Sequence, residues 1–372
     1  MLLLAIVFAL SGFGLAMCYS ASAVYAMSAF GDAFYFFKRQ LMWFFAGLVI
    51  LLAVQAVDYR MYKRYTMGLL IVSFVLLLLV LLPGIGHHVK GAARWINFGF
   101  FSLQPAEFVK VFVIIYLVKI FSRDRDDNKA GNIVARLFFP LLMVAAMFVL
   151  IMLQPDFSTA MELLFVAAVI FFVSGFPFIY MITLFILSIP MFYLLIYQVD
   201  YRRERLLAYL DPWKDRFGSG YHIIQSFIAF KKGALLGLGM GFGEQKIRRL
   251  PEPHTDFIFA VIAEEMGLFG TALIVILFCF FFIRVASIAL AAPDDFGCLL
   301  AVGLGVLIVV QAFINMGVVT GSLPATGIPL PFLSYGGSSF LSSMLAVGIL
   351  LNISRYRTGE TAKDTVTQEV LI

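Results

Sequence analysis

The chain has 372 residues, of which 62% are hydrophobic and 13% are charged, and its mean hydropathy is +0.98. Soluble domains carry about 25% charged residues, so this composition excludes an ordinary soluble protein. Long apolar runs separated by polar segments indicate membrane-spanning helices rather than a barrel. We therefore expect the chain to lie in a lipid bilayer, and we expect no nucleic-acid partner.

The apolar runs predict about ten transmembrane helices, and an even number places both termini on the same side. The expected fold class is an all-α polytopic membrane protein over residues 1–357. A large extracytoplasmic loop, 198–255, separates the seventh and eighth helices, and a polar cytoplasmic tail covers 358–372. The runs of spanning length fall near residues 2–19, 41–57, 66–82, 104–121, 137–153, 159–175, 178–197, 256–283, 297–320 and 332–353.

The basic residues of the short gaps set the predicted orientation, because Lys and Arg in short loops favour the cytoplasmic side. Lys and Arg gather in 58–64, in 119–136 and at Arg355 and Arg357, which predicts cytoplasmic termini. The basic loop 198–255 is too long to report topology. The segments predicted to face outward are 83–104, 154–158, 198–255 and 321–331.

The loop 198–255 contains two candidate helices and a glycine-rich run. Tyr201 to Tyr209 is a basic helical segment, and Tyr221 to Lys232 is amphipathic, which favours a position at the membrane interface. The alternating glycines of 237–243 resemble a nucleotide-binding loop, but no strand precedes them. We interpret that run as a flexible turn or as a close approach of the backbone to a ligand.

Three proline–acid pairs stand at outward helix ends. Each can be explained locally, because proline suits the first helical turn and an acid there can cap free N–H groups. Three on one face, with no counterpart on the other, favour a shared polar site. The pairs are Gln104-Pro105-Ala106-Glu107, Gln154-Pro155-Asp156 and Pro251-Glu252, the last followed by Asp256.

Charged residues inside or beside the apolar zone are functional candidates, because they are costly to keep there. Glu107 and Lys110 are three residues apart and share a helix face, so they form either an ion pair that pins two helices or a substrate contact. Arg94 is either an interfacial anchor or a phosphate clamp. His87 and His88 are too few for a metal site.

Proline and glycine break the backbone of 323–331 and 334–339, so this segment cannot be regular helix throughout. Irregular backbone at membrane depth is tolerated where it is buried in protein or lines a cavity. The segment is therefore predicted to form a wall of a site or of a lateral groove.

Several runs together resemble the SEDS (shape, elongation, division and sporulation) family, in order over about residues 10–355. The features near Tyr19, Phe37 and Gln245 resemble the FtsW division branch more than the RodA elongation branch. Ala106 departs from the family's usual serine, which is expected to weaken a hydroxyl contact. The matching runs are Tyr19-Ser20-Ala21-Ser22, Arg94-Trp95-Ile96, Gln104-Pro105-Ala106-Glu107-Phe108-Val109-Lys110, Gln154-Pro155-Asp156, His254-Thr255-Asp256-Phe257-Ile258-Phe259 and Pro329-Leu330-Pro331-Phe332-Leu333-Ser334-Tyr335-Gly336-Gly337-Ser338-Ser339.

The resemblance implies a ten-helix peptidoglycan glycosyltransferase that joins lipid II units at the outer face of the bacterial cytoplasmic membrane, at the division septum. It also implies a class B penicillin-binding protein and other division proteins as partners. The family's essential acid corresponds to Asp256. The expected substrate-binding residues are Arg94, Glu107, Lys110, Asp156, His254, Thr255, Ser334 and Ser338.

The chemistry requires a base for the acceptor hydroxyl and cations for the leaving pyrophosphate. We hypothesise that Asp256 is the base and that Arg94 and Lys110 stabilise the leaving charge. One or two basic residues of 198–255 could bind phosphate, the others meeting lipid headgroups. No cofactor is expected with certainty, and a divalent cation stays open. The alternatives are an elongation polymerase, a lipid II flippase and a non-catalytic scaffold.

Overall fold

The computed structural model describes residues 1–89, 92–99, 101–122, 133–248, 250 and 252–356. The predicted polar tail 358–372 and most of the basic gap 119–136 lie outside the described residues. Each of the ten apolar runs forms a helix, so the predicted helical membrane fold is confirmed. These helices are α1 (Leu2–Phe30), α2 (Tyr35–Ala56), α3 (Arg60–Leu81), α4 (Pro105–Phe121), α5 (Ile133–Leu153), α6 (Phe157–Val173), α7 (Phe178–Tyr197), α11 (Ile258–Leu290), α12 (Asp295–Val319) and α13 (Gly337–Ile353).

Within the described residues, six helices are long and apolar enough to span a membrane by themselves: α1, α2, α3, α7, α11 and α12. The others are shorter or interrupted by charge. Among these, α4 lies in the interior, packed against α3, α12 and α6. The structure therefore buries Glu107 and Lys110 of α4 among neighbouring helices.

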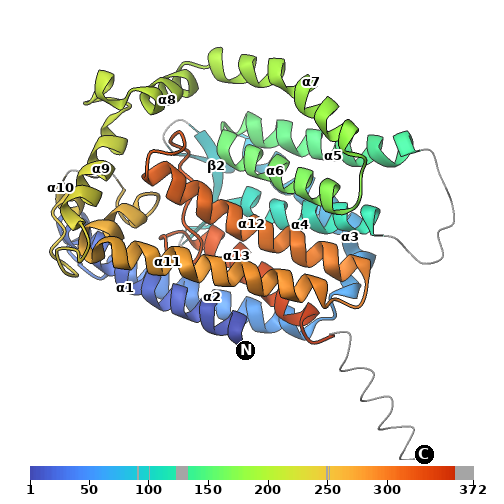
Figure 1. Ribbon diagram of the computed structural model, residues 1–372, viewed down its shortest axis with the longest axis horizontal. Helices are drawn as coiled ribbons and strands as arrows, with labels where there is room; N and C mark the ends of the chain where they lie inside the picture. The colour runs from blue at the N-terminus through green and yellow to red at the C-terminus, as the bar shows by residue number, and fades with distance from the viewer. Residues whose placement is uncertain (90–91, 100, 123–132, 249, 251, 357–372) are drawn as a thin grey trace, which may run out of the picture.

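The loop 198–255 contains the two predicted helices as α8 (Asp200–Leu210) and α9 (Tyr221–Gly233). A short 3₁₀ turn, Pro212–Asp215, and the single-turn α10 (Gln245–Arg248) complete it. Figure 1 shows α7 arching above the bundle, with α8 and α9 continuing down one end. No residue of α7 is buried, so this helix depends little on the rest of the bundle.

The segment 83–104, which is predicted to face outward, forms a small antiparallel sheet that the sequence did not lead us to expect. Its strands are β1 (Gly86–Val89), β2 (Ala92–Asn97) and β3 (Ser102–Leu103), in the order β1-β2-β3. Pairing satisfies the backbone groups of a segment too short and too interrupted by glycine to form a helix. The sheet places Arg94 on β2, at the same end of the bundle as α8 and the 321–336 segment (Figure 1).

Helix α11 is broken at Gly267, which has φ 63° and ψ −155°. The glycine-rich run crosses this break: the N–H groups of Leu238 and Gly239 donate to the carbonyls of Glu264 and Glu265 at 3.0 and 2.9 Å. A Cβ on Gly267 would lie 2.5 Å from the Gly237 nitrogen. The predicted close backbone approach therefore exists, but it meets a helix of the same chain, and the glycines are needed because two backbones touch.

Candidate active site

The predicted outward segments meet at one end of the bundle and hold one another through hydrogen bonds. The Ser334 hydroxyl donates to the Thr255 carbonyl at 2.6 Å and accepts from the Leu330 N–H at 2.8 Å. The Tyr335 N–H donates to the His254 carbonyl at 2.8 Å. The stretch before α11 is thus fixed to the broken segment before α13, as a shared site requires.

Asp256 is half-buried, two residues before the start of α11. The N-cap residue of α11 is Phe257, so Asp256 does not occupy the capping position. Its carboxylate lies over the backbone of the 321–336 segment, where a Cβ on Gly327 would sit 3.3 Å from Asp256 Oδ2. Gly327 has φ +79°, a conformation that favours glycine, and the missing side chain leaves room for the carboxylate.

The Asn315 amide of α12 fixes the backbone on both sides of this carboxylate. Its Nδ2 donates to the carbonyls of Asp256 and Ile328, both at 2.8 Å. Asn315 is 1% exposed, so water does not replace these bonds. One buried amide therefore sets the spacing between Asp256 and the Gly327 turn.

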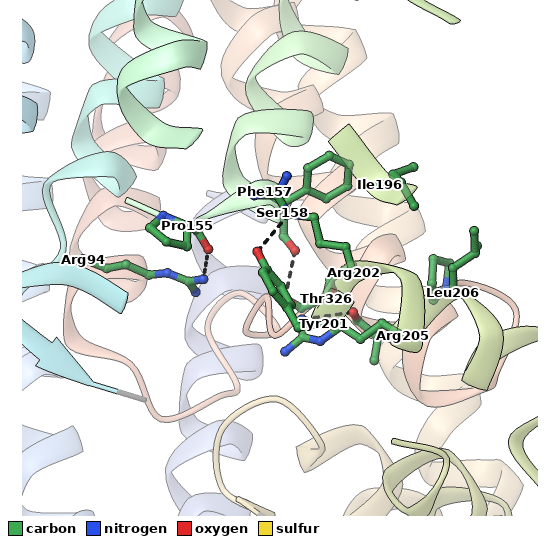
Figure 2. A pocket seen from close by; sticks show the side chains of 12 residues that line it. Arg94, Pro155, Phe157, Ser158, Ile196, Tyr201, Arg202, Arg205, Leu206 and Thr326 are labelled. Atoms are coloured by element: carbon green, nitrogen blue, oxygen red, sulfur yellow. Dashed lines mark hydrogen bonds between the residues drawn. The ribbon is translucent and has the colours of Figure 1, made fainter. Parts of the chain in front are cut away.

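A cavity of about 90 Å³ lies beside this turn, between β2, the start of α6 and the α7–α8 junction (Figure 2). Arg94 lies on one side of it, and Arg202, Arg205 and Tyr201 lie on the other. The remaining lining residues are Pro155, Phe157, Ser158, Ile196, Leu206, Pro324, Ala325 and Thr326. The Asp256 carboxylate lies near this cavity, because it adjoins Gly327, the residue after Thr326, and interacts electrostatically with Arg205.

Arg94 is oriented by the second proline–acid pair. Its Nε donates to the Gln154 carbonyl at 3.2 Å, its Nη2 donates to the Pro155 carbonyl, and its Nη1 lies 3.8 Å from Asp156 Oδ1. Asp156 caps α6 by accepting from the Thr159 N–H at 3.4 Å. The local capping explanation therefore applies to Asp156, and the same residue also holds Arg94 at the cavity.

The first proline–acid pair is tied to the same end of the bundle. Gln104 Nε2 donates to Asp156 Oδ2 at 2.8 Å, and the Gln104 N–H donates to the Ser338 hydroxyl at 2.8 Å. Ser338 is buried, as is Ser334. In this conformation both hydroxyls join loops to one another, and their contact with substrate stays a prediction.

Glu107 and Lys110 belong to a buried cluster inside the bundle. Lys110 Nζ lies 3.2 Å from Glu107 Oε2 and 2.8 Å from Glu162 Oε2, and all three side chains are at most 4% exposed. Lys110 also donates to Gln311 Oε1 at 3.4 Å. This geometry favours the pinning interpretation, since the lysine joins α4 to α6 and α12. A substrate contact of Glu107 or Lys110 stays a prediction.

His254 lies in an aromatic cluster rather than in open solvent. Its ring is near those of Tyr25, Phe36 and Tyr335, with centroids 6.1, 4.3 and 5.6 Å away. Burial lowers the pKa of His254 from 6.5 to about 4, against the weaker opposing charge of Glu252. The imidazole is therefore neutral at physiological pH. The Thr255 hydroxyl donates to the Glu252 carbonyl at 3.1 Å.

A second buried ion pair supports the break in α11. Lys246 Nζ donates to Glu265 Oε1 and, at 2.9 Å, to the Ser20 hydroxyl. Glu264 accepts from the N–H groups of Glu244 and Gln245 at 3.0 and 3.2 Å. These acids hold the outer loop against α1 and α11, which is a structural use of two carboxylates near the site.

Sequence reasoning missed Glu162, Gln311 and Asn315. The available signal was weak: a lone acid in α6, and two amides one turn apart in the apolar helix α12. Among the basic residues of the 198–255 loop, Arg202 and Arg205 line the cavity, whereas Arg203 pairs with Asp200 at 3.8 Å at the surface.

In the described part of the chain, ten apolar helices with a cavity and several charged groups at one end define a multi-pass membrane protein with a polar site. The chain belongs to the FtsW/RodA/SpoVE family of cell cycle proteins, whose model matches residues 1–359. The predicted family is thereby confirmed.

Among curated relatives, a probable peptidoglycan glycosyltransferase FtsW from Geobacter metallireducens is 44% identical over 352 residues, covering 94% of this chain and 93% of its own. The stage V sporulation protein E of Bacillus subtilis is 44% identical over 357 residues, covering 96% and 97%.

Solved structures agree with this family. A chain from a peptidoglycan synthase complex that coordinates polymerization and crosslinking has a TM-score of 0.77 at 28% identity, covering 96% of this chain and 98% of that chain. The rod shape determining protein RodA of Thermus thermophilus has a TM-score of 0.69 at 26% identity, covering 95% and 96%.

Proposed function

We propose that the protein is a peptidoglycan glycosyltransferase that polymerises lipid II at the outer face of the bacterial cytoplasmic membrane. The observation that carries this proposal is the Asp256 carboxylate beside the Gly327 turn, at the edge of an arginine-lined cavity. The relatives of matching length named as peptidoglycan glycosyltransferases support it.

The reaction is one inverting displacement. The acceptor hydroxyl oxygen attacks the anomeric carbon of the donor sugar, the bond from that carbon to the lipid pyrophosphate breaks, and the pyrophosphate leaves with the electron pair. Asp256 takes the proton of the acceptor hydroxyl, which contributes about 10²–10⁴ in rate. Hydrogen bonding of its backbone by Asn315 holds the carboxylate in place for this step.

The expected substrate-binding residues divide by position. Arg94 reaches the cavity directly, and Asp156 orients it. His254, Thr255, Ser334 and Ser338 shape the walls around Asp256, and we expect sugar contacts from the exposed hydroxyl of Thr255. For Glu107 and Lys110 we propose an indirect role through α12 rather than contact with the leaving group.

The chain gathers no metal cage of its own among the described residues, where no three His, Cys, Asp or Glu side chains come together. A divalent cation as cofactor stays a prediction, and such an ion would need oxygen ligands from the substrate pyrophosphate.

We further propose a location and partners. The termini lie in the cytoplasm, and the protein works at the division septum with a class B penicillin-binding protein and other division proteins. The division role is supported by relatives named FtsW, and an elongation role like that of RodA is the alternative. Depletion of the protein should produce filaments, whereas rounded cells would instead support elongation.

The test of activity uses purified protein and lipid II in detergent. Wild-type protein should form glycan strands, and Asp256→Asn should abolish them while the unfolding midpoint stays unchanged. Native polymerisation by the folded variant would refute the assignment of Asp256 as the base. A transporter would form no polymer in detergent, and a scaffold would form none with its partner's active site disabled, so the assay also separates these alternatives.

A further inference from the structure

Three guanidinium groups converge on the cavity from separate parts of the chain. Arg94 comes from β2, and Arg202 and Arg205 come from one face of α8, three residues apart (Figure 2). Strand β2 and helix α8 are far apart in the sequence, and only the fold brings their arginines together. The concentration of positive charge is therefore a property of the folded chain.

The positive charge at the cavity exceeds the acid that pairs with it. Among the described residues, the ion pair at the cavity is that of Arg94 with Asp156, at 3.8 Å. Arg205 is still in contact with solvent, yet surrounding protein atoms desolvate its guanidinium enough to lower its pKa. The charge of Arg94 acts in the same direction, while Tyr201 and Asp256 oppose it. Three guanidinium groups close together repel one another, so their net electrostatic interaction is unfavourable without a ligand. A bound anion would make the net interaction favourable.

The arginines of α8 are positioned by neutral groups. Arg202 donates to the Leu195 carbonyl and to the Tyr201 hydroxyl, both at 2.9 Å, and its guanidinium lies 5.2 Å from the centre of the Phe157 ring. Arg205 donates to the Ala325 carbonyl at 3.3 Å. A guanidinium has five N–H donors, so these contacts orient both groups and leave donors for a ligand. Carbonyls and rings do this without neutralising the charge.

The cavity also has an apolar side. Ile196, at the end of α7, and Leu206, on α8, line it beside the arginines. Next to them, α7 has no buried residue and is long and apolar enough to span a membrane, so the cavity adjoins an exposed apolar helix. A ligand with an anionic head and a hydrocarbon tail matches both walls, whereas free phosphate would use only the arginines.

We propose that Arg202 and Arg205 of α8, together with Arg94, bind the pyrophosphate of the lipid-linked sugar donor. This inference rests on the proposed function and deepens it. When the anomeric carbon–oxygen bond breaks, the electron pair and the added negative charge pass to the pyrophosphate, and these guanidiniums stabilise it. The proton of the acceptor passes to Asp256 on the neighbouring turn. Lys110, enclosed by two carboxylates inside the bundle, is not needed for this charge.

Binding of the leaving group tests the inference without turnover. Purified full-length protein in detergent is titrated with undecaprenyl pyrophosphate, and the dissociation constant is measured by thermophoresis. Arg202→Gln and Arg205→Gln should each raise it roughly 10-fold to 100-fold, because each removes charge-assisted hydrogen bonds. Arg205→Lys should have an intermediate effect, since it keeps the charge without the planar fork.

Arg203→Gln is the matched control, because Arg203 lies on the same helix but does not line the cavity. It should bind as wild type does, and all variants should share the wild-type unfolding midpoint. If Arg205→Gln unfolds early, Arg205→Lys and Arg202→Gln decide the result. Undecaprenol, which lacks the pyrophosphate, should not compete.

Wild-type affinity in both glutamine variants would overturn the inference, as would equal competition by phosphatidylglycerol, which would indicate a general headgroup site. The binding result and the polymerisation result can fail separately. Arginine-dependent binding by a protein that forms no polymer would refute the function and keep the site. Normal polymerisation and binding by both variants would refute the site and keep the function.

Discussion

The Asn315 amide offers the sharpest test of how the fold positions Asp256, the carboxylate that we propose as the base. Replacing it with leucine removes both 2.8 Å hydrogen bonds and leaves the carbonyls of Asp256 and Ile328 buried without this donor. Each unsatisfied buried group costs about 1–3 kcal/mol. The turn that contains Asp256 and the segment that contains Ile328 are then free to separate, and a misplacement of about 1 Å at a reacting group lowers the rate about 10²-fold.

The assay is steady-state polymerisation of lipid II by purified Asn315→Leu, together with its unfolding midpoint. We expect kcat to fall about 10-fold to 100-fold with little change in KM, because the amide positions the base and does not line the cavity. Asn352→Leu is the control: its amide also makes two 2.8 Å bonds to backbone groups, of Tyr59 and Gln55, at the opposite end of the bundle. It should lose similar stability and keep its kcat. Equal kcat losses in both variants, or none in Asn315→Leu, would refute the reasoning.

Three further predictions concern stability, each measured as the unfolding midpoint of purified protein. Lys110→Met should destabilise the folded protein by about 3–5 kcal/mol, because it leaves two buried carboxylates without a cationic partner. A variant as stable as the wild type would contradict the buried cluster. Lowering the pH from 7 to 5 should reduce the free energy of unfolding by about 2 kcal/mol through His254. The pKa of His254 is about 4 in the folded protein, below its ordinary value of 6.5, so the unfolded chain binds more protons than the folded protein in this pH range. His254→Phe should lose this dependence, and an unchanged profile would exclude the buried imidazole as its source. Gly267→Ala should destabilise by more than about 1 kcal/mol because its φ is 63° and a Cβ would meet Gly237; wild-type stability would mean that α11 is not broken there.

The membrane fold was predictable because its cause is local. A spanning helix needs about 20 apolar residues, and each such run in the sequence forms a helix in the structure. The periodicity of Tyr201 to Tyr209 and of Tyr221 to Lys232 likewise predicted α8 and α9. The meeting of the predicted outward segments at one end followed from counting the spans, and the hydrogen bond of Ser334 to Thr255 agrees with it.

The sequence could not show which of several residues of the same type take part in the site, because that depends on contacts between distant segments. Several basic side chains of the 198–255 loop were candidates, and only the placement of α8 distinguishes Arg205 from Arg203. The partner of Lys110 beyond Glu107 lies on another helix, where Glu162 has no local signal. The break at Gly267 was also hidden, because hydrophobicity continues through it and the compensating hydrogen bonds come from the distant glycine-rich run.

Two sets of charged groups in the bundle differ in how they are paired, and this difference bears on the function. Inside, Lys110 is enclosed by Glu107 and Glu162, so each charge there already has an opposite partner. At the cavity, Arg202 and Arg205 are oriented by carbonyls and aromatic rings, which carry no opposite charge. An enzyme that binds an anionic leaving group needs positive charge at its site, beside its base. Helix α12 connects the two kinds, since Gln311 bonds to Lys110 and Asn315 bonds to the Asp256 backbone one turn further on. The buried cluster therefore serves the outer site by fixing the helix that positions Asp256.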